Sequence, residues 1–413
     1  MQAHLTSAEV MQLLGIKKQT LYAYASRGVL RRVSLPESRR SMYVREDVER
    51  LLARKTRLSG EAQRASESGA SSAAGAGAPV IASAITEITS KGPKYRGIDV
   101  CELAVHPGYI ENVAELLWTG VLTDEPVVWV NDPPPDNLEA TIAALQQGER
   151  RVPILRVMAA ASLVLGEPAA EELRSGSTPR LARRIISVYA GCLGWLRSRP
   201  RLIHRDDGEA LAHLALRALG AETNARAVAA LNAVLICCAD HELSTATYTA
   251  RVVASTGAGL QACLIAAIGA HSGHLLGGSC DRLESLIGAV PKLDNLRSSL
   301  TSDKLPQRKI PGFGHPIYPA GDTRGEFLLD LAMQLGKKAW ADAFRASVDE
   351  VRSQTGLGPS LELGIVAVAK ALDLPPRSAS ALWAVGRSVG WVAHVMEQRL
   401  SGTVIRPRAR AIG

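Results

Sequence analysis

Helical periodicity runs through almost the whole chain after residue 80, and it restricts the fold more than any other feature. Apolar residues recur there at the i, i+3, i+4 and i+7 spacing of amphipathic helices, as in 111–122 (ENVAELLWTGVL). Only 4% of residues are aromatic, while Ala, Leu and Gly are abundant, which favours packed helices over sheets. The exception is 81–96, where a short hairpin is expected. The sequence thus predicts an all-α body, with further helices over 211–219, 225–238, 259–270, 326–335 and 378–399.

Residues 58–79 divide the chain. The run from Gly69 to Pro79 is almost entirely Gly, Ala and Ser, which is the composition of a flexible linker. It separates residues 1–57 from a body that begins near residue 80, and a length of 413 residues with 46% apolar content predicts two or three domains. Because there is no stretch of eighteen apolar residues and no signal-like start, we expect a cytoplasmic protein with no membrane partner.

The six cysteines do not form a metal-site pattern. None makes a CxxC pair, and no His lies at zinc-finger spacing from them. We therefore expect reduced thiols that pack as small apolar side chains, with no metal and no cofactor. These thiols are Cys101, Cys192, Cys237, Cys238, Cys263 and Cys280.

Positive charge is concentrated at the N-terminus. Residues 1–57 contain twelve Lys or Arg and five Asp or Glu, a net charge of +7, whereas the whole chain has +8 and the remainder only +1. Such an asymmetry indicates a polyanionic partner for this segment.

The same segment has the pattern of a helix-turn-helix with a wing. Thr6 and Glu9 form a capping box, and Val10, Leu13 and Leu14 supply an apolar stripe. The expected elements are a first helix ending at Gly15, a second over 18–27, a basic wing over 29–43 and a third helix over 45–52.

This pattern (LTSAEVMQLLGIKKQTLYAYASRGVL, then RRSMYVREDVERL) resembles the winged helix of MerR-type regulators over about fifty residues. The resemblance implies that the second helix enters the major groove of DNA. A protein-docking or relic domain remains the alternative. The candidate DNA contacts are Lys17 just before the second helix, Lys18, Gln19, Thr20, Tyr22 and Tyr24 in that helix, and Arg39 and Arg40 in the wing.

Three motifs in the body carry side chains suited to an anionic ligand. Asp240-His241-Glu242 follows an apolar helix, His274 lies in a glycine-bracketed turn, and a Pro/Gly-rich loop over 311–319 presents His315. A structural His held by its neighbouring carboxylates is the alternative for His241. Arginines bind carboxylates bidentately, so two His with several Arg predict an enzyme or receptor for a di- or tricarboxylate. The candidate arginines are Arg324, Arg387 and Arg406.

Several motifs in chain order resemble citrate synthase. They are KYRGIDVCELA, CADHELSTATYTARVVASTGAGLQACLIAAIGAHSG, PGFGHPIYPAGDTR, GRSVGWVAHVMEQ and IRPRAR, and the resemblance covers residues 80–413. It implies an all-helical fold of a large and a small domain, with the small domain inserted roughly over 280–380. It also implies a homodimer that condenses acetyl-CoA or another acyl-CoA with oxaloacetate.

The resemblance also assigns roles. His241 would bind oxaloacetate, and His315 would donate a hydrogen bond or proton to its carbonyl. Arg324 and Arg387 would hold its carboxylates, while Arg406 would reach the neighbouring subunit's site. The CoA adenine would be wrapped by Pro311, Gly312, Phe313, Gly314 and Pro316.

Two positions depart from the family pattern in the half of the reaction that activates acetyl-CoA. Leu276 replaces a His that hydrogen-bonds the thioester oxygen, and Glu362 replaces the Asp that acts as general base. His274, two residues before Leu276, is a candidate substitute donor. Milder departures are Ser244 for Asn and Ala411 for an aromatic residue.

Two functions follow from these observations. The first is a citrate or 2-methylcitrate synthase with impaired turnover. The second is a non-catalytic sensor in which oxaloacetate or citrate controls DNA binding by residues 1–57, which requires different ligand affinities in the two DNA-binding states.

Overall fold

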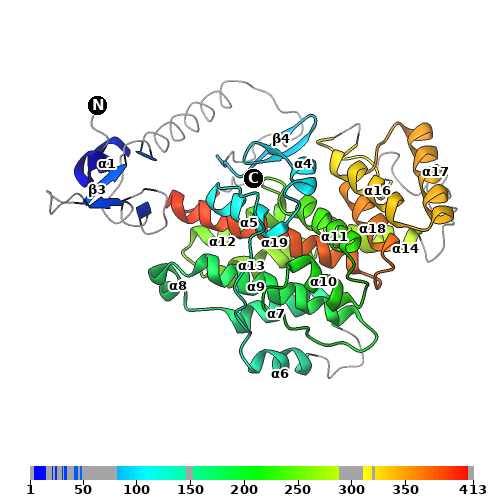
Figure 1. The fold of residues 1–413 in the computed structure, drawn as a ribbon, viewed down its shortest axis with the longest axis horizontal. Coiled ribbons are helices and arrows are strands. Elements are labelled where there is room, and N and C mark those ends of the chain that lie inside the picture. The colour runs from blue at the N-terminus through cyan, green and yellow to red at the C-terminus, as the bar shows by residue number, and fades with distance from the viewer. Residues whose placement is uncertain are drawn as a thin grey trace, which may run out of the picture. The chain divides into compact units, whose positions relative to one another are not determined.

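A computed structural model describes residues 4–14, 21, 24–25, 30, 32–34, 41–44, 47–48, 81–145, 152–287, 310–318 and 321–407. The chain forms two compact units, Met1–Ala84 and Ile85–Gly413 (Figure 1). Each unit has a hydrophobic core of its own.

The first unit combines a three-stranded sheet with helix α1 (Ser7–Leu14). Strand β3 pairs antiparallel with both β1 and β2, so β2 and β3 form the expected wing hairpin. The predicted capping box is present, since the Thr6 N–H donates to Glu9 Oε2 at 2.7 Å. Strand β1, which ends at Thr6, was not predicted. The strands are β1 (His4–Thr6), β2 (Arg32–Ser34) and β3 (Ser41–Val44).

The core of the first unit corrects one detail of the predicted stripe. Val10 and Leu14 are buried, whereas Leu13 is 45% exposed because it lies on the outer side of α1. The described parts of the second and third predicted helices, Leu21 with 24–25 and 47–48, have helical backbone; the rest lies outside the described residues. The buried residues are Leu5, Val10, Leu14, Leu21, Leu30, Tyr43 and Val48.

The second unit opens with the expected hairpin. Strands β4 (Thr86–Thr89) and β5 (Gly92–Tyr95) pair antiparallel, and β6 (Ile98–Asp99) adds a third strand to β5. Gly92 has a φ of +113°, a backbone conformation that residues other than glycine rarely adopt, so the turn depends on this glycine.

The remaining elements that the structure describes in the second unit are helices. All six predicted body helices are present: those over 211–219 and 225–238 have the predicted bounds, and the other four have shifted ends. The helix predicted over 111–122 stops at Thr119 because Gly120 takes the left-handed conformation that ends helices. The helices are α4 (Val100–Val105), α5 (Ile110–Thr119), α6 (Asn137–Ala144), α7 (Ile154–Leu165), α8 (Ala169–Ser175), α9 (Thr178–Cys192), the 3-10 helix η1 (Leu193–Leu196), α10 (Leu211–Leu219), α11 (Ala225–Cys238), α12 (Thr245–Ser255), α13 (Leu260–His271), α14 (Gly278–Ile287), α16 (Thr323–Leu335), α17 (Lys338–Thr355), α18 (Leu361–Ala371) and α19 (Ser378–Ser401).

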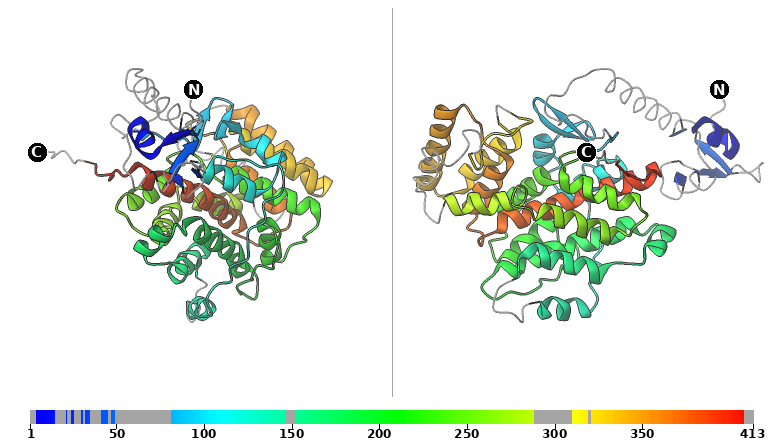
Figure 2. Two further views of the ribbon diagram at one scale, coloured as in Figure 1. Left: turned by 60° about the vertical axis from the view of Figure 1, so that its left-hand side comes forward. Right: turned by 180° about the vertical axis from the view of Figure 1, so that it is seen from behind.

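Helix α19 runs through the centre of the second unit and is the longest helix described (Figure 2). It packs against α5, α9, α11, α12 and α13, so its side chains are buried almost throughout. Helices α14, α16, α17 and α18 pack on one another at one end of this unit. The small domain expected over 280–380 includes these helices, and its boundary stays a prediction.

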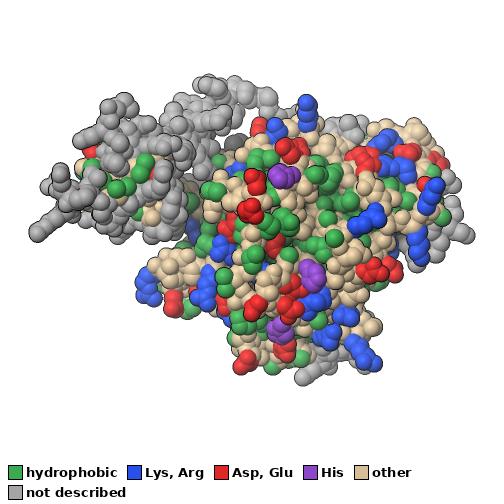
Figure 3. All heavy atoms as spheres, viewed as in Figure 1, with side chains coloured by type: hydrophobic (Ala, Val, Ile, Leu, Met, Phe, Trp, Pro, Cys, Tyr) green, Lys and Arg blue, Asp and Glu red, His purple; other side chains and the backbone are tan. Residues whose placement is uncertain are grey.

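The surface of the second unit carries both signs of charge. Figure 3 shows Lys and Arg side chains interspersed with Asp and Glu over the visible face, in keeping with the small net charge of this part of the sequence. Among the described residues, none of the helices is both long and apolar enough to cross a membrane.

Candidate functional site

The Asp240–Glu242 loop begins where α11 ends, and α19 fixes its path. Asp240 is fully buried, His241 is half-buried and Glu242 is exposed. The Gly390 N–H of α19 donates to the Ala239 carbonyl at 2.9 Å, and a Cβ at Gly390 would lie 2.4 Å from Asp240 Oδ1. The helix can therefore approach this loop only because residue 390 is glycine.

The Pro/Gly-rich loop that carries His315 is pinned to the start of α18. The Gly314 N–H donates to the Gly358 carbonyl at 2.9 Å, and the Ser360 N–H donates to the Gly312 carbonyl at 2.9 Å. Gly312 and Gly314 have φ of +85° and +69°. These backbone bonds hold the loop beside the first turn of α18, where Glu362 lies.

The two predicted site histidines lie together with a tyrosine that sequence reasoning did not single out. The ring centroids of His241 and His315 are 5.5 Å apart, and His315 stacks on Tyr318 at 5.2 Å. His241 Nε2 lies 3.0 Å from Tyr318 Oη. Burial, together with the charge of Arg324, lowers the pKa of both imidazoles, that of His241 well below its ordinary value, so both rings are neutral near pH 7.

Arg324 is buried and already paired with a carboxylate. Its Nη2 lies 2.7 Å from Asp322 Oδ2, its Nε donates to Asp322 Oδ1 at 3.0 Å, and its Nη1 donates to the Cys237 carbonyl at 3.1 Å. Burial of Asp322 raises its pKa, but Arg324 outweighs that effect and lowers the pKa below its ordinary value. In this structure the guanidinium fork is thus occupied by Asp322.

Arg387 of α19 is the more available cation. Its Nε donates to the Cys238 carbonyl at 2.7 Å, its Nη1 lies 3.5 Å from Ser244 Oγ, and its guanidinium carbon lies 5.8 Å from the Trp383 ring centroid. Burial lowers the pKa of Arg387, while nearby Asp240 opposes this. No carboxylate pairs with it directly among the described residues, so its fork can accept one from a ligand.

The glycine-bracketed turn carries leucine at position 276 and histidine at position 274. Leu276 is half-buried, and its N–H donates to the Gly273 carbonyl at 3.0 Å. His274 is exposed, and its carbonyl accepts from Arg282 Nη2 at 3.0 Å. The histidine considered as a substitute donor therefore lies on the outer side of the turn.

A second histidine, His271, lies under this turn, and sequence reasoning did not single it out. It is 2% exposed, and a Cβ at Gly277 would lie 2.7 Å from its Nε2. Its ring packs edge-on against Trp383 and Trp391, at 5.1 and 5.7 Å between centroids. A lone His on the apolar face of α13 was the only signal that could have revealed it.

Glu362 stands in the first turn of α18, next to the start of α14. It is half-buried, and Ser279 Oγ donates to its Oε1 at 3.4 Å. The structure thus brings the carboxylate predicted to be the base close to the turn that carries Leu276. Ser279 had no distinguishing signal in the sequence, because a serine after two glycines is common in turns.

The remaining candidates lie apart from this cluster or outside the described residues. Phe313 is 4% exposed and bridges to Pro359, so it supports the loop from inside, whereas Pro316 is exposed. Arg406 is exposed near the end of the described chain. Tyr24 packs against the core of the first unit. Outside the described residues lie Ala411, Lys17, Lys18, Gln19, Thr20, Tyr22, Arg39 and Arg40.

Comparisons with known proteins identify the family. A family model described as citrate synthase, C-terminal domain, matches residues 74–408. The chain belongs to the citrate synthase family. A second model, a helix-turn-helix domain, matches residues 5–56 and confirms the N-terminal module.

Three members of the citrate synthase family illustrate the distance of the relationship. "Putative citrate synthase 2" of Mycobacterium tuberculosis H37Rv is 33% identical over 198 residues, which are 46% of this chain and 53% of that protein, so the match spans about half of that relative. A 2-methylcitrate synthase of Shewanella oneidensis is 27% identical over 79% of this chain and 90% of its own. The structure of Thermoplasma acidophilum citrate synthase with carboxymethyl coenzyme A and oxaloacetate has a TM-score of 0.69 at 20% identity, covering 82% of this chain and 94% of that one, and it confirms the fold.

Proposed function

We propose that the citrate-synthase-family unit binds oxaloacetate, or a similar keto dicarboxylate, beside His241, His315 and Arg387. In this proposal the chain condenses the keto acid with acetyl-CoA or another acyl-CoA only slowly. The bound structure of the Thermoplasma relative, which contains oxaloacetate and a coenzyme A derivative, supports this substrate class. The juxtaposition of His241 and His315 around Tyr318 supports the keto-acid half of the site.

The residues divide the chemistry between them. Arg387 would pair with a ligand carboxylate. Arg324, which is already paired with Asp322, would attract the ligand only through its longer-range positive charge. A neutral imidazole at His315 would donate a hydrogen bond to the keto oxygen as negative charge develops there. Glu362 would remove a proton from the carbon next to the thioester, and that carbon would then bond to the keto carbon. The keto oxygen would take up a proton and become a hydroxyl, and water would cleave the thioester to release the CoA thiol.

The observation that carries the slow turnover is the side chain of Leu276. An isobutyl group cannot donate a hydrogen bond to the thioester oxygen when the enolate forms, and loss of one such donor costs about a hundred- to a thousand-fold in rate. The only other imidazoles of the described turn region are His274, which faces outward, and His271, which is enclosed under Gly277. The extra methylene of Glu362 adds a displacement of on the order of 1 Å for the base.

A thiol-release assay with acetyl-CoA and oxaloacetate tests this proposal. We expect wild-type turnover to be low, and Leu276→His combined with Glu362→Asp to raise it by about a hundred-fold. Leu275→His is the matched control, since Leu275 is the neighbouring turn residue and is 70% exposed. Wild-type turnover comparable to that of active family members would refute the impairment. Equal activation by the control would show that the position of the imidazole is irrelevant.

The second subunit and the acyl-CoA complete the proposed site. A homodimer would bring Arg406 of one subunit to the site of the other, which agrees with its exposed position in the single chain. The backbone around Pro311, Gly312, Gly314 and Pro316 would contact the CoA adenine, with Phe313 as internal support.

The helix-turn-helix module favours a second candidate function, a ligand-controlled DNA-binding regulator. The module holds nearly all of the net positive charge of the chain, and the substituted positions lie in the acyl-CoA half of the site. Separate calorimetric titrations with oxaloacetate, citrate and acetyl-CoA distinguish the two functions. Binding of the carboxylic acids without acetyl-CoA binding supports the regulator, and binding of both substrates supports the slow enzyme.

A further inference from the structure

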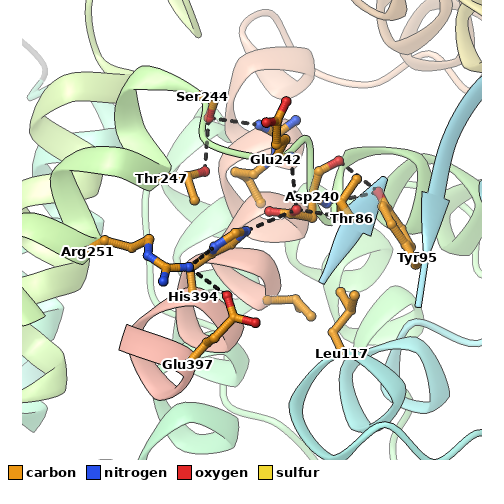
Figure 4. Close-up of polar contacts among 12 residues, drawn as sticks. Thr86, Tyr95, Leu117, Asp240, Glu242, Ser244, Thr247, Arg251, His394 and Glu397 are labelled. Atoms are coloured by element: carbon orange, nitrogen blue, oxygen red, sulfur yellow. Dashed lines mark hydrogen bonds and ion pairs between the residues drawn. The ribbon is translucent and has the colours of Figure 1, made fainter. Parts of the chain in front are cut away.

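A buried chain of polar side chains leads from the edge of the second unit to the residue before His241. Figure 4 shows its members, which come from β4, the loop after α11, α12 and α19. Asp240, His394 and Arg251 are at most 1% exposed, and Glu397 closes the outer end with its side chain 22% exposed. Three titratable groups, Glu397, Arg251 and His394, thus line up behind Asp240 of the site loop.

Hydrogen-bond chemistry fixes the direction of this chain. Arg251 Nη1 donates to Glu397 Oε2 at 2.7 Å and lies 3.1 Å from His394 Nδ1. A guanidinium can only donate, so His394 Nδ1 must be the acceptor, and the ring proton sits on Nε2. Nε2 lies 3.2 Å from Asp240 Oδ2, to which it therefore donates. Arg251 in this way directs the Nε2–H of His394 toward Asp240.

The same carboxylate oxygen holds the loop that carries His241. Asp240 Oδ2 also accepts from Thr86 Oγ1 at 2.6 Å and from the Glu242 N–H at 3.1 Å. Glu242 has φ of +51°, an unusual backbone conformation for a residue with a side chain, and the bond to Asp240 stabilises it. Burial raises the pKa of Asp240, but its bond to His394 and the nearby Arg387 outweigh this and keep it ionised.

We propose that His394 is a positioning residue for the keto-acid site. Through Asp240 it holds the His241 loop in its folded path, and it keeps a counter-charge next to Arg387, without contacting the ligand itself. The proposal rests on the proposed function, because it assigns His394 to the same site. It predicts that replacing the His394 side chain shifts the NMR signals of the His241 imidazole, with or without a bound ligand.

The test compares three variants of the full chain. His394→Phe fills the ring volume without hydrogen bonds, and His394→Gln restores one donor and one acceptor on a planar group. Tyr189→Phe is the matched control, because it removes the buried hydrogen bond between Tyr189 and Ser162 in another part of the core. The measurements are oxaloacetate affinity by calorimetry and the imidazole signals of ¹⁵N-histidine-labelled, ligand-free protein, with His241 assigned from a His241→Gln variant.

We expect His394→Phe to weaken oxaloacetate binding by about ten-fold or more and to shift the His241 signal. His394→Gln should recover most of the affinity, and Tyr189→Phe should change neither measurement. Normal affinity together with an unshifted His241 signal in His394→Phe would overturn the proposal. If the wild-type protein does not bind oxaloacetate, the proposed function fails, and the His241 signal alone decides the role of His394.

If His394→Phe does not fold, Glu397→Gln replaces it. Glu397 lies at the partly exposed outer end and touches Arg251, not Asp240. Because Glu397→Gln weakens the hydrogen bond to Arg251, it should shift the imidazole signals of both His394 and His241 in the labelled variant. Unchanged signals would count against the proposal as clearly as the first result.

Discussion

At the scale of single residues, the candidate site is a set of buried charges and dipoles that largely compensate one another. Arg324 faces Asp322, and Arg387 lies near Asp240, so the cationic lining expected from the sequence is accompanied by two buried carboxylates. Removing one member of such a pair leaves an unpaired buried charge, which typically costs about 3–5 kcal/mol. His271 differs from these groups because its Nε2 is buried without a hydrogen-bond partner among the described residues.

Replacing His271 with leucine should change how stability depends on pH. Burial, with a smaller contribution from Arg387, lowers the pKa of His271 from 6.5 to about 3. In the unfolded chain His271 binds a proton below about pH 6.5, whereas in the folded protein it binds one only below about pH 3. Folding stability is therefore lost as pH falls through this range, by up to about 1.4 kcal/mol per pH unit.

Urea unfolding of both proteins between pH 7 and pH 5 measures this effect. We expect a shallower pH dependence for His271→Leu and equal or greater stability at pH 7, because the unpartnered nitrogen is gone. Asp240 and Asp322 also lose stabilising charge in acid, so the difference between the two proteins is the informative quantity. Parallel curves would show that His271 is protonated as easily as in the unfolded chain.

At the scale of elements, the contact between α19 and the end of α11 decides the shape of the site. Two glycines of α19 make this approach possible: Cβ atoms at Gly386 and Gly390 would lie 2.6 Å from the Leu235 carbonyl and 2.3 Å from the Ala239 carbonyl. Both values are shorter than real Cβ contacts, and both neighbours are backbone atoms that cannot rotate away.

A methyl group at residue 390 should therefore separate the two helices. We expect Gly390→Ala to destabilise the second unit by about 1–3 kcal/mol and to weaken oxaloacetate binding, since it presses on Asp240. Gly269→Ala is the control, because Gly269 lies in α13 with nothing within 4 Å of its added Cβ. That variant should gain up to about 1 kcal/mol from helix propensity. Thermal unfolding of both would contradict this account if Gly390→Ala were as stable as its control.

The elements were predictable from the sequence, but several of their contacts were not. Periodicity located six helices of the second unit, the last of them Ser378–Ser401, but not the other helices that the structure describes there. The resemblance placed His241 and His315 in one site. Neither periodicity nor the resemblance could show that Arg324 forms an ion pair with Asp322 or that the His274 side chain is exposed. These two features depend on side-chain rotamers, which neither signal contains. His394 was hidden in the same way, since a histidine inside an apolar helix has no partner in its own sequence neighbourhood.

At the scale of the whole molecule, two units of different composition share one chain. A compact helix-turn-helix domain with net positive charge precedes a citrate-synthase-family unit whose charges nearly cancel. Because the net positive charge lies in the N-terminal unit, we expect a polyanion to be attracted to that unit and not to the citrate-synthase-family unit.

DNA binding by the N-terminal unit should depend steeply on salt. For a fluorescent mixed-sequence duplex, we expect the logarithm of affinity to fall linearly with the logarithm of salt concentration. Lys17→Ala with Lys18→Ala should reduce that slope by about 1–2 if both contact phosphate. Lys337→Ala with Lys338→Ala, at the start of α17, is the control. No measurable affinity at low salt, or a slope equal to that of the control, would favour a docking or relic role.

Strand β4 gives the order of these units along the chain a mechanical meaning. It is the first element of the second unit, and the hydroxyl of its first residue, Thr86, donates to Asp240 at 2.6 Å. On the next strand, the Tyr95 hydroxyl lies 3.0 Å from the carbonyls of Ile236 and Asp240. A pulling force applied to the chain before β4 would therefore act first on a strand that is hydrogen-bonded to Asp240, the residue before His241.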